Sequence, residues 1–205
     1  MLRVFSENPY SENDGIGFTN AQIFDSYVEA TLIKRVPTSL QEFDTLSNSF
    51  VQKNIFVFDE ITFYIDLEHN LLYSFASMAK LNKVKSILRN YIQGRILYEN
   101  IELKPTKIIS QMGNDLEYKV NEIVIKKFIY NQGAVGKFVA QIGDDNIGQE
   151  LMIAYSNEIQ RVTFEIYSNS FKNFILTTSS NNTLNVKCEE EDLFCIVDNI
   201  KSQLK

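Results

Sequence analysis

In the middle of the chain the spacing of apolar residues changes once, from the period of a β-strand to that of an α-helix. Strand-like residues occupy Ile55–Phe58 and Ile61–Leu67 and return, after a short turn, over Leu71–Phe75. From Ser77 the apolar residues recur at helical spacing, and Gly94 is placed to end the helix. We therefore predict an antiparallel hairpin followed by an amphipathic helix over about 77–92.

The last third of the chain shows a similar order of elements. Strand-like segments at Arg161–Tyr167, Phe171–Thr178 and Thr183–Cys188 precede a helical pattern over 190–204, and acidic residues stand at the start of that pattern, as a helix N-terminus favours. The sequence thus predicts an α+β fold. We expect a mainly antiparallel sheet built from hairpins, each followed by an amphipathic helix, at about 77–92 and 190–204.

The length and composition are compatible with one domain or two. The chain has 205 residues, 44% of them hydrophobic, and can bury a sizeable core without disulfides or a metal. A single α+β domain over 1–205 is the simplest prediction. An Ile/Val-Thr-Phe triplet occurs at 61–63 and again at 162–164, so two similar halves, 1–94 and 95–205, form the alternative.

An earlier segment favours a strand followed by a short helix. Tyr27–Val36 is partly β-branched and stops at Pro37, which cannot donate a hydrogen bond to a neighbouring strand. After it, Ser39 and Glu42 have the spacing of a helix capping box. We therefore predict a strand that ends near Pro37 and a short helix that runs to about Leu46.

Charge is divided into three blocks along the chain. Residues 1–73 carry 4 basic and 11 acidic side chains, residues 74–137 carry 11 and 5, and residues 138–205 carry 5 and 10. The whole chain has a net charge of -6, which argues against a surface that binds nucleic acid everywhere. A basic block in an acidic protein indicates either a site for an acidic partner or a counterweight to its own flanks.

The basic block centres on the predicted helix at 77–92. No acidic residue occurs between Ser74 and Tyr98, so the helix lacks the ion pairs that usually decorate a solvated face. The candidate binding residues are Lys80, Lys83, Lys85, Arg89 and Arg95. The main interpretation is a non-catalytic recognition protein whose basic segment docks an acidic partner, either a protein subunit or nucleic acid. The sequence also leaves a homo-oligomer open, as well as neutralisation by the chain's own acidic first third.

Catalytic patterns are few. His69 is the only histidine, it lies in a turn where we expect it to be solvated, and a histidine-based triad or metal site is disfavoured. The alternative function is a metal-dependent phosphodiesterase or nuclease that uses a Glu-x-Lys strand motif, Glu102 and Lys104, together with an upstream acid such as Asp66. The main interpretation requires no cofactor and no metal.

Location and origin follow from weaker signals. Cys188 and Cys195 have a spacing that matches no metal or redox motif, and residues 1–10 lack the apolar run of a secretory signal, so we expect reduced thiols in the cytoplasm. No apolar run is long enough for a membrane span. The 20 Asn and 23 Ile suggest an AT-rich genome, as in a bacterium or a phage, and a role in phage or bacterial defence would suit either function.

Overall fold

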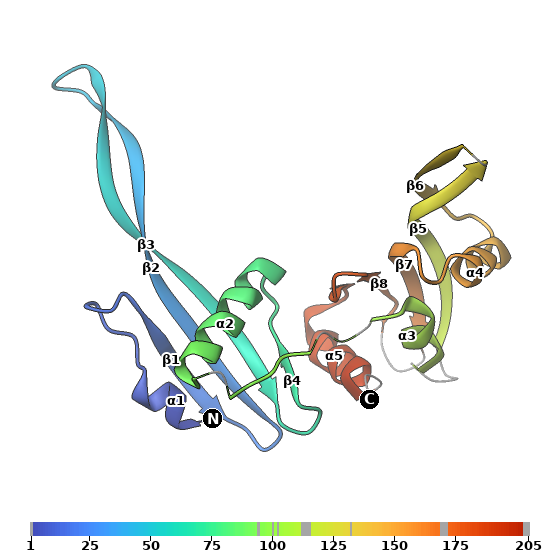
Figure 1. Ribbon diagram of the computed structural model, residues 1–205, viewed down its shortest axis with the longest axis horizontal. Coiled ribbons are helices and arrows are strands. Elements are labelled where there is room, and N and C mark those ends of the chain that lie inside the picture. The colour runs from blue at the N-terminus through green and yellow to red at the C-terminus, as the bar shows by residue number, and fades with distance from the viewer. Residues whose placement is uncertain are drawn as a thin grey trace. The chain divides into compact units, whose positions relative to one another are not determined.

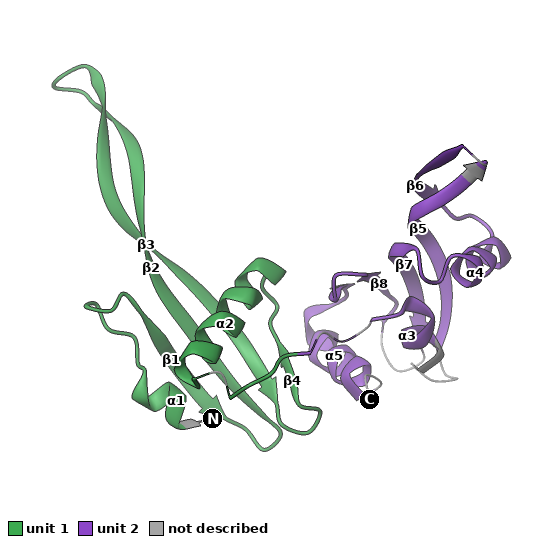
Figure 2. Cartoon of the chain, in the orientation of Figure 1, with its two compact units in different colours: residues 1–98 green, residues 99–205 purple. Residues whose placement is uncertain are grey.

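The structure is a computed structural model of the chain, and it describes residues 2–93, 95–99, 101, 103–111, 116–131, 133–168 and 172–202. The fold is α+β with antiparallel sheets, as the sequence predicts. The chain divides into two compact units, Met1–Tyr98 and Glu99–Lys205 (Figures 1 and 2). Each unit has a separate hydrophobic core and a separate sheet.

The first unit is a four-stranded antiparallel sheet with two helices. Its strands follow one another in the order β1-β2-β3-β4, so each pairs with its neighbour in sequence. The elements are α1 (Leu2–Glu7), β1 (Ile16–Ile23), β2 (Tyr27–Asp44), β3 (Ser49–Asp66), β4 (Leu71–Tyr73) and α2 (Met78–Tyr91).

The core of this unit lies between one face of the sheet and the two helices. Alternate residues of β2, from Val28 to Leu32, and of β3, from Ile61 to Ile65, are buried on that face. Phe5 of α1 and Val84 and Leu88 of α2 pack against them. Because side chains alternate along a strand, the register of β2 with β3 decides which residues reach this core.

The β2–β3 hairpin continues far beyond the sheet (Figure 1). β1 pairs with β2 only as far as Lys34, and β4 pairs with β3 only from Tyr64, whereas β2 and β3 pair without a break from Tyr27↔Asp66 to Asp44↔Ser49. Residues 35–58, which we call the arm, therefore form a two-stranded ribbon.

The helix predicted to follow Pro37 is wrong, because these residues continue β2 to Asp44. Pro37 is tolerated since no third strand lies beside β2 at this level to need its missing N–H. The residues that suggested a capping box make contacts across the ribbon instead. Ser39 Oγ donates to Asn54 Oδ1 at 3.1 Å, and Glu42 forms an ion pair with Lys53 at 3.3 Å.

The second unit is a five-stranded antiparallel sheet in the order β6-β5-β7-β8-β9. Its core lies between the strands and two helices: Met152 of α4 (Asp145–Ala154) and Ile196 and Ile200 of α5 (Leu193–Ser202) pack against β5, β7 and β8. The elements are α3 (Pro105–Gln111), β5 (Leu116–Asn131), β6 (Ala134–Gln141), α4 (Asp145–Ala154), β7 (Ile159–Ser168), β8 (Phe174–Ser179), β9 (Thr183–Lys187), the 3-10 turn η1 (Glu190–Asp192) and α5 (Leu193–Ser202).

The structure does not show the predicted rule that each hairpin is followed by a helix. Helices occur near the predicted positions, at 78–91 and 193–202, but the β1–β2 hairpin runs directly into β3. α1 and α3 instead precede the strands of their units, and no helix in the described part of the chain is long and apolar enough to cross a membrane. Whether the two units are related halves stays a prediction.

Gly17 of β1 lies where the backbone of residues 8–10 passes close beside this strand. A Cβ atom at this position would lie 2.4 Å from the carbonyl oxygen of Pro9 and from Cα of Tyr10. Both atoms belong to the backbone, which is held beside β1 by hydrogen bonds between Tyr10 and Phe18 (3.0 Å) and between Phe18 and Asn8 (2.9 Å). An alanine would therefore force the segment away from the strand.

We expect Gly17→Ala to lower the free energy of unfolding of the first unit by about 1 to 3 kcal/mol, the usual cost of overpacking. Urea unfolding followed by hydrogen exchange of peptides from residues 2–98 measures this. The control is Gly136→Ala, because a Cβ at that strand position meets nothing within 4 Å. Equal midpoints for the two variants would contradict the close approach at Gly17.

Candidate functional site

Helix α2 begins and ends with local signals in its own sequence. The Ser77 hydroxyl accepts a hydrogen bond from the Lys80 N–H at 3.5 Å, as an N-cap residue does. After the last turn Gln93 takes a positive φ of 53°, which turns the chain away from the helix. Because Val84 and Leu88 face the core, the basic residues of α2 are left on its two flanks.

One flank of α2 is joined to the sheet by a shared carboxylate. Lys80 Nζ lies 2.9 Å from Asp59 Oδ1, and Lys83 Nζ lies 2.7 Å from Asp59 Oδ2. Asp59 is on β3, opposite Lys34, on the same face as the core residue Ile61. Hydrogen bonds from Lys83 and then Lys80 hold the pKa of Asp59 below its ordinary value.

The other flank carries cations that have no carboxylate partner among the residues that the structure describes. Lys85 Nζ lies 5.7 Å from the ring centroid of Tyr98, within the range of a cation–π contact. Arg89 is exposed on the last turn, and Arg95 is exposed beyond the helix. Neither arginine forms an ion pair with any carboxylate that the structure describes.

The outer side of α2, between these two flanks, is uncharged and exposed. It presents Ala79, Asn82, Ser86 and Asn90. A flat partner can therefore approach the helix closely and reach cations on both sides. We call this area the α2 surface: Lys80, Lys83, Lys85, Arg89 and Arg95, with the four uncharged residues between them. Of these five cations, Lys80 and Lys83 form ion pairs with a carboxylate that the structure describes, and both pairs use Asp59.

The residues of the alternative nuclease site lie in different parts of the chain. Asp66 belongs to the first unit, Lys104 to the second, and Glu102 lies outside the described residues. Within the residues that the structure describes, no group of three or more His, Cys, Asp or Glu side chains is arranged to hold a metal ion.

Asp66 has a local role that the sequence did not indicate. It is buried, it accepts the backbone N–H of His69 at 2.8 Å, and its Oδ1 lies 3.0 Å from His69 Nδ1. The His69 side chain is only 12% exposed, so the expectation of a solvated histidine is wrong. This pair closes the turn between β3 and β4, where Asn70 takes a positive φ of 55°.

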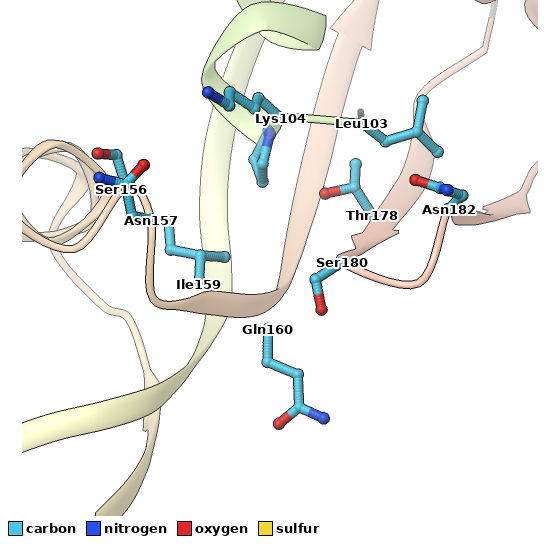
Figure 3. A pocket seen from close by; sticks show the side chains of 10 residues that line it. Leu103, Lys104, Ser156, Asn157, Ile159, Gln160, Thr178, Ser180 and Asn182 are labelled. Carbon is cyan, nitrogen blue, oxygen red and sulfur yellow. The ribbon is translucent and has the colours of Figure 1, made fainter. Parts of the chain in front are cut away.

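The second unit has a small pocket of about 140 Å³ near the start of α3 and the ends of β7 and β8 (Figure 3). The hydroxyl of Thr178 is buried there without a hydrogen-bond partner among the described atoms. In Figure 3 the side chains of Lys104 and Gln160 point in opposite directions. These two side chains therefore do not converge on one ligand position, as the polar groups of a small-molecule site do.

Neither a scan against models of known protein families nor a search of curated proteins found a match to this chain. The function is therefore argued from the α2 surface itself.

The ion pairs of Asp59 predict a pH-dependent contribution to stability. Because the pKa of Asp59 is lowered in the folded state, this contribution is complete above the ordinary value of 3.8 and is lost as the pH falls through the lower folded value. We expect Asp59→Asn to destabilise the first unit by about 0.5 to 1 kcal/mol near neutral pH, since both lysines are partly exposed. Urea unfolding over a pH series measures the difference, which should shrink in strong acid.

Asp25→Asn is the matched control for this experiment. It removes the same charge from an exposed residue of the same unit. If both substitutions change the midpoint equally, the effect would be one of net charge, and the shared carboxylate would contribute nothing specific.

Proposed function

We propose that this protein is a recognition protein that binds an acidic macromolecule through the α2 surface. The observation that carries the proposal is the excess of positive charge on this surface within a chain of net charge -6. It has five cations, and the ion pairs described for them join two of the five to the single carboxylate of Asp59. An excess of positive charge kept on a rigid helix is suited to partners that supply carboxylates or phosphates.

The ion pairs with Asp59 leave the ammonium groups of Lys80 and Lys83 partly accessible and only partly neutralised. The side chains of Lys80 and Lys83 remain 42% and 49% exposed while they contact Asp59. One carboxylate neutralises one charge, so the two lysines together keep an excess positive charge. Asp59 thus fixes where the two ammonium groups lie and leaves them accessible.

An acidic protein surface suits the α2 surface better than nucleic acid. Sequence-independent binding to phosphates grows with the number of cations that contact the backbone, and here both flanking blocks of the chain are acidic. A protein partner needs only a few carboxylates matched to Lys85, Arg89 and Arg95. Because the cysteines form no disulfide, we extend the proposal to a partner in the reducing cytoplasm.

The test compares two triple variants that remove the same charge. We expect Lys85→Gln, Arg89→Gln and Arg95→Gln together to abolish retention of the protein on immobilised polyglutamate at low ionic strength, where charge contacts are least screened. The control replaces three exposed lysines of the second unit by Gln: Lys126 and Lys127 of β5 and Lys137 of β6. The control should be retained like the unchanged protein.

The same variants identify the class of partner. Purification of the tagged protein from its host, with and without nuclease treatment, should recover a protein that survives the nuclease and is lost only with the α2 variant. Equal loss with both triple variants would refute the α2 surface as the site. Recovery that depends on nucleic acid, together with retention on immobilised DNA, would show that phosphates are the target.

A further inference from the structure

The arm has two faces of different chemistry. Residues that pair directly across antiparallel strands share a face, so the register assigns every side chain of the arm. The face opposite the helices presents Pro37, Ser39, Gln41, Phe43, Phe50, Gln52, Asn54, Phe56 and Phe58, with Arg35 at its base. We call this the Phe face, because it carries all four phenylalanines of the arm.

The Phe face is free of charged side chains from Pro37 to Phe56. The charged residues within this stretch, Glu42, Asp44 and Lys53, all lie on the other face of the arm, where Glu42 and Lys53 form an ion pair. The single charged residue of the Phe face is Arg35, whose guanidinium lies 4.6 Å from the ring centroid of Phe56. Depletion of charge combined with enrichment in aromatic residues is the composition of an interface core.

The phenylalanines are exposed in the single chain. Phe43, Phe50, Phe56 and Phe58 are between 47% and 71% exposed. Their aromatic contacts are local: Phe43 packs edge-on against Phe50 at 5.2 Å, and Phe58 against Tyr10 at 6.0 Å. A ribbon of two strands is marginally stable alone in water, and a contiguous exposed apolar patch marks an interaction surface. The arm therefore gains from a partner that covers the Phe face.

A second copy of the chain fits this face by size and charge. Together with the polar side chains between them, the phenylalanines offer on the order of 800 Å² of accessible surface, which each partner of a standard interface buries. The arm as a whole has two basic and two acidic residues, so two arms meet without the repulsion expected of a chain with net charge -6. Because the Phe face has no charged side chain from Pro37 to Phe56, that stretch selects neither an acidic nor a basic partner.

We propose that the protein forms a homodimer in which the arms of two copies pack Phe face against Phe face. A two-fold axis places the same residues of both copies against each other, so this interface is isologous and closes at two subunits. The amide and hydroxyl groups of Ser39, Gln41, Gln52 and Asn54 lie midway along the face and can exchange hydrogen bonds across it. This proposal does not depend on the α2 surface.

The test measures the mass of the full chain in solution. Light scattering and sedimentation over a wide range of concentrations should give twice the 23.7 kDa of one chain. We expect Phe50→Ser with Phe56→Ser to raise the dissociation constant of the dimer at least about 100-fold, because aromatic anchors dominate interfaces. The matched control, Leu40→Ser with Val57→Ser, removes exposed apolar side chains from the other face of the same arm. It should change the constant less than about threefold.

A shortened arm separates loss of the interface from loss of folding. Replacing residues 37–56 by Asn-Gly joins the paired residues Val36 and Val57 with a two-residue hairpin turn and leaves the core residues untouched. This variant should be monomeric and should keep the circular dichroism expected of an intact sheet.

The proposal would be overturned by a monomer at every concentration, by a dimer that survives both the Phe variants and the shortened arm, or by equal weakening from substitutions on the two faces. A monomer that binds phospholipid vesicles through Phe50 and Phe56 would also overturn it and would assign the arm to a membrane surface.

Discussion

The pairing of β2 with β3 is the constraint on which the first unit depends. Its register runs unbroken from Tyr27↔Asp66 at the base to Asp44↔Ser49 at the tip. Within the sheet this register places Leu32 and Ile61 in the core, and just beyond the core it places Asp59 beneath α2. Further out the same alternation sorts charged residues to one face and phenylalanines to the other. Core, ion pairs and candidate interface thus follow from one set of backbone hydrogen bonds.

The two proposed surfaces lie on opposite faces of that hairpin. α2 covers the face that continues as the charged face of the arm, whereas the Phe face is on the opposite side, where the described helices of the unit make no core contacts. A partner on α2 and a second copy on the arm would therefore not compete for the same side chains. A dimer would present the α2 surface twice, and two linked contacts can bind a repeated or dimeric partner far more tightly than one.

The sequence predicted the parts of the fold that local signals determine. The helix at 78–91 has a cap, an amphipathic stripe and a clear end, and β3, its turn and β4 are bounded by polar residues. The arm was missed because Pro37 and the Ser39–Glu42 spacing are local signals for ending a strand and starting a helix. Pairing with residues 49–58 overrode them, and pairing across a hairpin is not local. The alternation of Phe50, Phe56 and Phe58 with charged or aliphatic neighbours was the signal that could have revealed the ribbon.

The candidate site was predicted in composition and missed in detail. A basic helix without acidic neighbours is visible in the sequence, and the basic residues of α2 were named from it. That Lys80 and Lys83 would share Asp59, while Arg89 would meet no described carboxylate, depends on which strand face lies beneath each flank. Charge counts along a chain contain no information on that arrangement. Asp59 lies more than 20 residues before Lys80 and Lys83 in the sequence but contacts both in the fold.

The regular pairing of the arm also sets how its length can change in evolution. Each strand alternates with a period of two residues, so a single inserted or deleted residue in β2 or β3 would carry the side chains between that point and the turn to the opposite face. Phe43 or Phe50 would then point where Glu42 and Lys53 point now. Changes of two residues in each strand preserve the faces and only lengthen or shorten the ribbon. Arm length in related chains should therefore vary in steps that keep this parity, with the turn at Thr45–Asn48 moving along the ribbon axis.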